Sequence, residues 1–224
     1  VLGIIPARGG SKGIPKKNIK LLNGKPLIAY TIASAKTSKF LDRVILSSED
    51  PEIIDVAKKL DLEVPFIRPN DLAEDKSPTL PVIKHALNYF KSKGIHYDAV
   101  CLLQVTSPFR SEGFIDKAIE TFKSKGTDAL ISVLEVPHEY NPHWTFKPNK
   151  EGQLEIATGD KQIISRRQDL PPAYYRDGAI YITKSEVIIN QDSLYGKSIS
   201  FIQSDPNRHV NIDTLDDWNK AETL

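Results

Sequence analysis

The sequence has one cysteine and no methionine among its 224 residues. A lone cysteine excludes an internal disulfide, and because Cys101 stands in the apolar run AVCLLQ, we expect a small buried side chain in a reducing compartment. No apolar segment approaches the roughly 18 residues that cross a bilayer, and the chain opens on a strand-like run instead of a secretory leader. We therefore expect a cytoplasmic protein with no membrane partner.

The sequence also has no excess of charge of either sign. Its formal net charge is +1, with 26% charged and 40% hydrophobic residues, which is typical of a soluble globular protein and excludes a disordered chain. A nucleic-acid-binding protein would carry a broad basic face, so we expect no nucleic-acid partner. The length suits one α/β domain, and we expect a single domain over residues 1–224.

Two common phosphate-binding glycine motifs are absent. The Gly-Lys-Ser at 196–198 has Gln191 where a P-loop has its first glycine. Gly9, Gly10 and Gly13 do not have the spacing G-x-G-x-x-G of a dinucleotide site. A phosphate site in this chain must therefore be built differently.

The first 18 residues, VLGIIPARGGSKGIPKKN, carry the strongest functional signal. Val1–Ile5 is apolar except for Gly3, which predicts a strand buried at the centre of a parallel sheet. The glycines that follow free the backbone to turn and to bring its N–H groups close to an anion. Positive charge around the same point comes from Arg8, Lys12, Lys16 and Lys17. This pattern predicts a polyphosphate site, with a solvated basic loop as the alternative.

Strand and helix signals alternate along most of the chain, which predicts a mostly parallel sheet covered by helices. In such sheets ligands bind at the carboxyl ends of the strands, where the loop after Ile5 and the turn Gln104–Arg110 both lie. The expected strands are Val1–Ile5, Val44–Leu46, Val64–Ile67, Ala99–Leu103, Ala129–Val133, Ala179–Thr183, Ser198–Ile202 and Val210–Ile212. The expected helices are Pro26–Lys36, Pro51–Leu60 with Asp50 as N-cap, Leu80–Lys93, Ser111–Lys123, Ser185–Ile189 and a last helix capped by Thr214 and Asp217.

The alternation stops between about Glu135 and Tyr175, where prolines and aromatic residues give no long periodic element. We expect a hairpin near Gln153–Ala157 and a protruding arm, residues 136–176, within the single domain. So long an arm is poorly stabilised alone, so we expect it to pack on a neighbouring subunit, with a lid over the cleft as the alternative.

Five segments together resemble the acylneuraminate cytidylyltransferase family, the CMP-sialic acid synthetases and CMP-legionaminic acid synthetase-like members. These segments are IIPARGGSKGIPKKN, PFIRPNDLAED, LLQVTSPFR, RRQDLPPAYYRDGAIYI and NIDTLDDW, and the match runs from end to end. The resemblance implies a Rossmann-like three-layer nucleotidyltransferase fold with a mostly parallel sheet and a small dimerisation arm. It further implies transfer of CMP from CTP to the anomeric hydroxyl of a nine-carbon 2-keto sugar acid, release of pyrophosphate, a need for Mg²⁺ and a homodimer.

The resemblance also implies roles for individual residues. Arg8, Lys12 and Asp213 take catalytic positions, and Arg8 is the strongest candidate because its planar guanidinium can hold two phosphate oxygens at once. For Arg68, a surface ion pair is an equally good interpretation. The nucleotide-binding residues implied are Arg8, Ser11, Lys12, Lys17, Asn18, Arg68 and Gln104.

The acceptor site is implied at Gln104, Arg167 and Tyr174, with Arg167 on the sugar carboxylate and Arg166 as its substitute if the register slips by one. Glutamine at position 104 favours nonulosonic acids over Kdo. Asp177 replaces an asparagine of many relatives, and His143 with Trp144 stands near a usual lysine. These departures lie where the sugar's side chain and acyl groups should bind, so they argue against N-acetylneuraminate itself and favour legionaminate-like acids; N-acetylneuraminate, legionaminate and KDN all stay open as acceptors.

The metal site is implied at Asp213 and Asn211: in many relatives two aspartates at this place alternate along a strand and so project to the same face, and here the pair reads Asn211, Ile212, Asp213. Asn211 offers a neutral oxygen at best, so the number of metal ions stays open; the alternative is that Asp213 merely begins the cap of the last helix. No general base is identified, nor whether the arm completes a partner's site. Two other functions remain: a nucleotidyltransferase of the same fold for Kdo or a sugar 1-phosphate, and a catalytically silent nucleotide-binding protein.

Overall fold

A computed structural model describes residues 1–75 and 77–224 of the protein. The strands are β1 (Leu2–Pro6), β2 (Leu21–Leu22), β3 (Lys25–Pro26), β4 (Arg43–Ser47), β5 (Ala99–Leu102), β6 (Ala129–Glu135), β7 (Phe146–Pro148), β8 (Leu154–Ile156), β9 (Tyr174–Lys184) and β10 (Ile199–Gln203). The α-helices are α1 (Leu27–Lys36), α2 (Pro51–Lys59), α3 (Thr79–Ser92), α4 (Phe114–Lys125), α5 (Ser185–Asn190) and α6 (Leu215–Glu222). Within the described residues, no helix has the length and apolar character of a membrane span.

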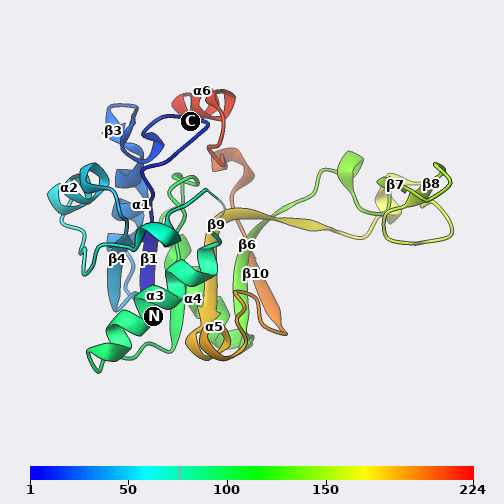
Figure 1. Ribbon diagram of the computed structural model, residues 1–224. Helices are drawn as coiled ribbons and strands as arrows, with labels where there is room; N and C mark the ends of the chain where they lie inside the picture. The colour runs from blue at the N-terminus through cyan, green and yellow to red at the C-terminus, as the bar shows by residue number, and fades with distance from the viewer. Residues whose placement is uncertain (76) are drawn as a thin grey trace. The chain divides into compact units, whose positions relative to one another are not determined.

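The central sheet runs in the order β10-β6-β9-β5-β1-β4 (Figure 1). β1 lies between β4 and β5 and pairs with both in parallel, whereas β5 pairs with β9 in the antiparallel direction. The expected α/β class and the central position of the first strand are confirmed. Because β1, β4 and β5 are parallel, their carboxyl ends share one edge of the sheet, and the loops that follow them meet there.

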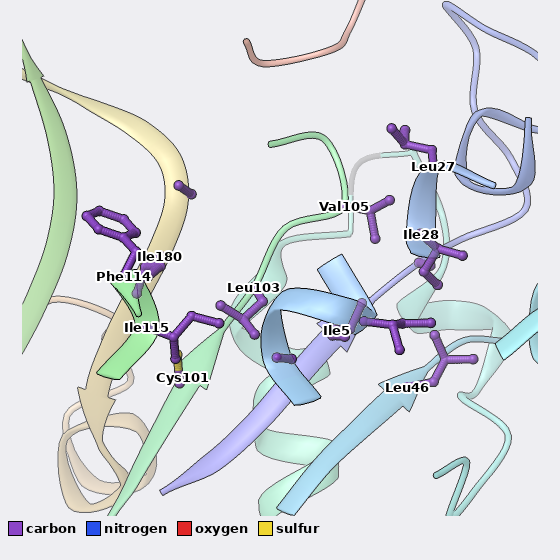
Figure 2. Packing of buried hydrophobic residues seen from close by; sticks show 14 of the residues in the cluster. Ile5, Leu27, Ile28, Leu46, Cys101, Leu103, Val105, Phe114, Ile115 and Ile180 are labelled. Carbon is purple, nitrogen blue, oxygen red and sulfur yellow. The ribbon is translucent and has the colours of Figure 1, made fainter. Parts of the chain in front are cut away.

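Helices cover both faces of this sheet because the buried strands are apolar on both sides. Leu2 and Ile4 of β1 pack with residues of α3 and α5 in one core. Ile5, which points the other way, packs in a second core with Ile28 of α1 and Ile115 of α4. Figure 2 shows this second core, in which Cys101 is fully buried as expected. Burial raises the pKa of the Cys101 thiol to about 12. With helices on both faces of the sheet, the fold has three layers.

Side-chain caps begin two helices as the sequence predicts. Asp50 accepts the backbone N–H of Ile53 at the start of α2, and Thr214 forms a capping box with Asp217 at the start of α6. The expected start of the fourth helix at Ser111 is wrong, since α4 begins at Phe114. Gly113 has φ +69°, in the left-handed region, and a residue with this backbone conformation cannot be part of a right-handed α-helix.

Two expected strands are wrong. Val64–Ile67 forms no strand: the sheet contact is one parallel bridge between Ile45 and Glu63, the residue before this segment, and Pro65 has no N–H to extend a ladder. Val210–Ile212 lies outside the sheet as well. Ile212 instead donates one backbone hydrogen bond to Thr106, in the turn that follows β5. Asn211 and Asp213 therefore flank a loop residue that is pinned to this turn.

The chain forms two compact units, one of residues 1–132 with 177–224 and one of residues 133–176. The second unit contains the residues of the expected arm, and its hairpin is confirmed: β8 pairs with β7, with Ile156 opposite Phe146. In this unit the His143 ring contacts Asp160, and Trp144 donates its indole N–H to the carbonyl of Ile164. The role of the arm in dimerisation stays a prediction.

Candidate active site

A cleft of about 420 Å³ opens in the first unit, at the edge of the sheet where β1 and β5 end. Its walls come from the loop after β1, the turn after β5, described residues within 68–75 and 77–82, and Asp213. The structure thus brings together most of the residues that the sequence singled out, although they are spread over 200 positions. The predicted residues that line the cleft are Arg8, Ser11, Lys12, Lys17, Asn18, Arg68, Gln104 and Asp213.

The loop after β1 is held by hydrogen bonds to its own backbone. The Asn18 amide donates to the carbonyl of Arg8 over 2.9 Å, and the N–H of Gly9 donates to the Glu49 carboxylate over 2.8 Å. The N–H of Ser11 donates to the carbonyl of Gly9, closing a tight turn. The N–H of Gly9 is therefore already bonded to a carboxylate of this chain, and the positive side chains of the loop are left to do more of the phosphate binding.

Two loop glycines are required by close packing rather than by an unusual φ. A Cβ atom on Gly9 would overlap the Asp50 carboxylate, and one on Gly13 would overlap the backbone carbonyl of Asp213. Neither glycine has a positive φ. The contact at Gly13 places the predicted phosphate loop directly against the predicted metal residue.

Two of the cations that line the cleft, Arg8 and Lys12, share one carboxylate. Asp75 lies 3.1 Å from Nη1 of Arg8 and 2.5 Å from Nζ of Lys12. The hydrogen bond from Lys12 is the main cause that holds the pKa of Asp75 below its ordinary value. An anion thus already lies between the two side chains expected to bind phosphate. Asp75 is the last residue of the family-like segment PFIRPNDLAED, but the sequence analysis gave it no role, because its contact joins this segment to residues more than 60 positions earlier.

Arg68 forms an ion pair, as one of its two interpretations predicts, but not on the surface. Its guanidinium is 4% exposed and contacts the Glu49 carboxylate at 2.5 Å and the carbonyl of Ala7 at 3.3 Å. Glu49 was missed by the sequence analysis. Its position at the carboxyl end of β4, on the edge where ligands bind, is the signal that points to it.

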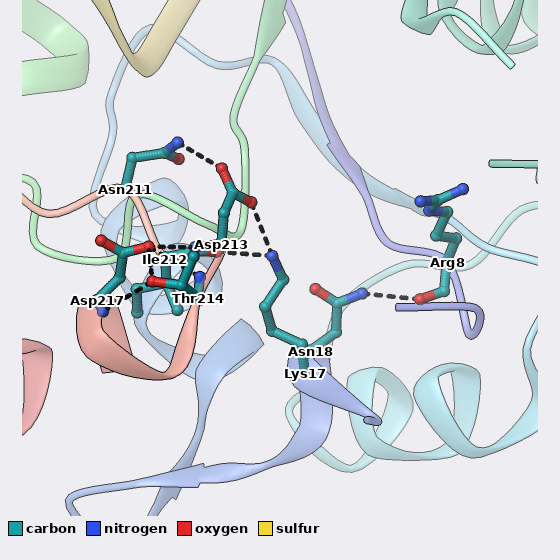
Figure 3. A network of polar contacts seen from close by, with 8 residues as sticks. All are labelled: Arg8, Lys17, Asn18, Asn211, Ile212, Asp213, Thr214 and Asp217. Carbon is teal, nitrogen blue, oxygen red and sulfur yellow. Dashed lines mark hydrogen bonds and ion pairs between the residues drawn. The ribbon is translucent and has the colours of Figure 1, made fainter. Parts of the chain in front are cut away.

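Asp213 is surrounded by donors (Figure 3). Lys17 donates to one of its carboxylate oxygens over 3.0 Å and to the carbonyl of Ile212 over 2.6 Å, while the Asn211 amide donates to the other oxygen over 2.8 Å. The capping box lies at Thr214 and Asp217, and Asp217 also accepts the N–H of Asp213 over 3.0 Å. The Asp213 side chain therefore takes no part in the cap and remains 62% exposed.

This donor set fits a hard cation only in part. Among the described residues no cluster of three or more His, Cys, Asp or Glu side chains has the arrangement of a metal site. Mg²⁺, however, is commonly held by one or two carboxylates together with phosphate oxygens and water. The exposed carboxylate of Asp213, which lines the cleft, fits a Mg²⁺ ion that arrives with a phosphate ligand. It does not fit a preformed cage.

Gln104 is positioned by a buried arginine that the sequence analysis did not assign. Arg110 donates to the carbonyl of Gln104 over 2.7 Å and to that of Ala179 over 2.8 Å. Burial lowers the pKa of Arg110 to about 10. Gly178, at φ +84°, lies where a Cβ atom would be 2.9 Å from the Gln104 side-chain oxygen and 3.8 Å from that of Asn211. The two amides therefore meet at this glycine.

Asp177, the departure next to Gly178, is 3% exposed. One of its carboxylate oxygens accepts the Ser132 hydroxyl and the N–H of Ala179, and the other has no hydrogen-bond partner within the described chain. Arg167 and Tyr174 lie in the second unit. There Arg167 lines a hollow of about 330 Å³ together with His138 and Asn141.

The sequence matches the cytidylyltransferase family over residues 2–224. It is 37% identical over 223 residues to the pseudaminic acid cytidylyltransferase of Campylobacter jejuni, a match that covers 100% of this chain and 95% of that protein. It is 35% identical over 228 residues to the CMP-N,N'-diacetyllegionaminic acid synthase of Legionella pneumophila, covering 100% and 95%. It is also 34% identical over 218 residues to the N-acylneuraminate cytidylyltransferase of Streptococcus agalactiae, a match that covers 96% of this chain and 51% of that protein.

Solved structures support the same fold at low sequence identity. A CMP:2-keto-3-deoxy-manno-octonic acid synthetase complexed with CTP superimposes with a TM-score of 0.73 at 15% identity, covering 100% of this chain and 97% of that one. A 4-diphosphocytidyl-2C-methyl-D-erythritol synthase from Anaerococcus prevotii gives 0.67 at 13% identity, covering 99% and 96%. The expected Rossmann-like nucleotidyltransferase fold is confirmed, and so is the resemblance that the motifs indicate.

Proposed function

This chain belongs to the cytidylyltransferase family, and from that premise we propose that it transfers CMP from CTP to the anomeric hydroxyl of a nine-carbon 2-keto sugar acid, releasing pyrophosphate. The relatives that it matches along its whole length are named for pseudaminic and N,N'-diacetyllegionaminic acids. The observation that carries the proposal is the cleft at the carboxyl edge of the sheet, where Arg8, Lys12, Lys17 and Arg68 come together.

Arg8 and Lys12 bind the triphosphate in this proposal. The acceptor hydroxyl oxygen attacks the α-phosphorus in line, an O–P bond forms, and the bond to the β-phosphate oxygen breaks as pyrophosphate leaves with the electron pair. The hydroxyl proton passes to water, since no side chain is assigned as its base. The leaving pyrophosphate gains negative charge, so fixed cations beside it stabilise the transition state more than the ground state.

Asp213, with Asn211 beside it, would hold Mg²⁺ together with the phosphates. When bound, the ion neutralises negative charge on the phosphate oxygens. Lys17 helps to fix the Asp213 carboxylate, because its ammonium donates to the carboxylate oxygen that Asn211 does not contact. In the acceptor site we assign Gln104 to the sugar and Arg167 to its carboxylate, with Tyr174 as a further contact.

We also propose a homodimer that forms through the second unit, and a cytoplasmic location. The second unit leaves several large apolar side chains in contact with solvent, and these would be covered by a second copy. They are Tyr140, Phe146, Leu154 and Ile163, with exposed fractions of 70%, 45%, 70% and 58%. Light scattering in solution measures whether the protein is a dimer.

A pyrophosphate-release assay tests the proposed reaction. The protein is given each of the four nucleoside triphosphates with N-acetylneuraminate, legionaminate, pseudaminate, KDN or Kdo in the presence of Mg²⁺. We expect release with CTP and at least one nine-carbon acid. Release with Kdo alone would indicate the alternative acceptor class, and CTP binding without release for any acid would indicate a silent nucleotide-binding protein.

Replacing Asp75 by asparagine is expected to tighten CTP binding about two- to fivefold. The carboxylate competes with phosphate oxygens for Arg8 and Lys12, and ion pairs at exposed sites have small energies, so the gain is modest. Calorimetric titration with CTP measures the effect. Asp71→Asn is the matched control, since Asp71 lies in the same stretch but does not line the cleft. Weaker binding in Asp75→Asn would mean that this carboxylate helps to hold the nucleotide or its metal.

A further inference from the structure

Glu49 connects two parts of the nucleotide site that are far apart in the sequence. It lies two residues beyond Ser47, the last residue of β4, and its side chain is 15% exposed. Oε1 accepts the backbone N–H of Gly9 over 2.8 Å, and Oε2 accepts Nη2 of Arg68 over 2.5 Å. One carboxylate thus holds the phosphate loop with one oxygen and the Arg68 guanidinium with the other.

Arg68 depends on this contact because it is almost completely buried. Its Nη2 makes a longer contact of 3.3 Å to the carbonyl of Ala7, and its Nε has no hydrogen-bond partner within the described chain. A guanidinium at 4% exposure that loses its counter-ion is strongly unfavourable, so it would reorient or draw in water. The backbone N–H of Arg68 also donates to Ser48 over 2.9 Å, which places the Arg68 segment beside Glu49.

We propose that Glu49 is a positioning residue, which fixes the Gly9 turn and the Arg68 guanidinium in the arrangement that receives a triphosphate. The inference rests on the proposed function, since it takes Arg8, Lys12 and Arg68 as the residues that bind the phosphates. Glu49 acts through them and need not touch the nucleotide. Its negative charge is offset by Arg68, so it can lie beside the site without repelling the phosphates.

Glutamine at this position cannot do the same work. Its amide has one acceptor oxygen and one donor NH₂ group, whereas both groups that Glu49 holds are donors. Glu49→Gln therefore keeps either the Gly9 contact or the Arg68 contact and sets its NH₂ against the other. We expect the Kd and the KM for CTP to rise about tenfold, with the KM for the sugar acid unchanged. Glu49→Asp keeps two acceptor oxygens but has a shorter reach, and should lose about two- to fivefold.

The matched control is Glu52→Gln. Glu52 lies three residues further along in α2 and pairs with Lys16 at 2.6 Å on the surface, so it tests the same charge change beside the same loop. Its CTP affinity should equal that of the wild type. In an Arg68→Ala background, Glu49→Gln should weaken CTP binding much less than it does alone, because residues that act through one another are not additive.

Calorimetric titration with CTP and with inorganic tripolyphosphate, and the thermal unfolding temperature, decide the proposal. Wild-type CTP affinity in folded Glu49→Gln overturns it, as does an equal rise in both KM values. If Glu49→Gln does not fold, Glu49→Asp decides, and wild-type affinity there overturns it.

The proposed function can fail separately. If the wild type releases no pyrophosphate but binds tripolyphosphate, and Glu49→Gln weakens that binding, the proposed function is wrong and the role of Glu49 stands. A wild type that binds neither ligand overturns both.

Discussion

Arg8→Ala is expected to lower kcat/KM for CTP about 10²- to 10³-fold, the usual effect of removing one fixed donor from a developing negative charge. Arg8 lines the cleft, and the Asn18 amide donates a hydrogen bond to the backbone carbonyl of Arg8. The Arg8 guanidinium therefore extends from a loop whose backbone is already ordered. Steady-state pyrophosphate release measures the change. Arg8→Lys should recover part of the loss, since a lysine keeps the charge but cannot hold two phosphate oxygens in a planar fork.

Arg43→Ala is the control for this experiment. Arg43 is an arginine of similar exposure to Arg8, with 34% of its side chain accessible, but it lies at the amino end of β4, away from the edge that carries the cleft. Its substitution should leave kcat/KM within about threefold of the wild type. If Arg8→Ala is as active as Arg43→Ala, Arg8 does not bind the phosphates, and the principal role assigned to the loop is wrong.

Asp213→Asn is expected to lower kcat about 10²-fold and to require about tenfold more Mg²⁺ for half-maximal rate. Position 211 is already an asparagine, so this change leaves the pair without any carboxylate for a hard cation. It also removes the partner of the Lys17 ammonium. Initial rates over a Mg²⁺ titration separate the two effects, because a metal ligand changes the Mg²⁺ requirement and a mere partner of Lys17 does not.

Asp216→Asn provides the control, since it makes the same substitution three residues later, on the exposed first turn of α6. Its Mg²⁺ requirement should equal that of the wild type. If Asp213→Asn shows an unchanged Mg²⁺ requirement at any rate of turnover, the assignment of Asp213 to the metal is wrong.

Features that depend on neighbours in the sequence could be predicted from it. The caps at Asp50 and Thr214 act within three or four residues, and the apolar run before Arg8 has a buried central strand as its only good environment. The position of the cleft follows from the parallel order of the strands. That is why Arg8, Gln104 and their neighbours meet as expected, even though they come from different loops.

Features that depend on distant partners could not be predicted in this way. Val210–Ile212 has the composition of a strand, but its neighbour is the turn at Thr106, which offers one hydrogen bond and no ladder. Neither Asp75 nor Glu49 received a role from the sequence, although Asp75 ends a family-like segment and Glu49 follows a predicted strand. Their significance comes from arginines that folding brings to them. The helix expected from Ser111 includes Gly113, whose left-handed φ delays the start of α4 to Phe114.

The contact between Lys17 and Asp213 joins residues 196 positions apart, and Gly13 packs against the same aspartate. Translation at about 5–20 residues per second separates the synthesis of these two sides of the cleft by on the order of 10 to 40 seconds. A nascent chain therefore carries its cationic loop long before the aspartate that pairs with it has been made. The cleft gains this wall only when the segment around Asp213 has emerged from the ribosome.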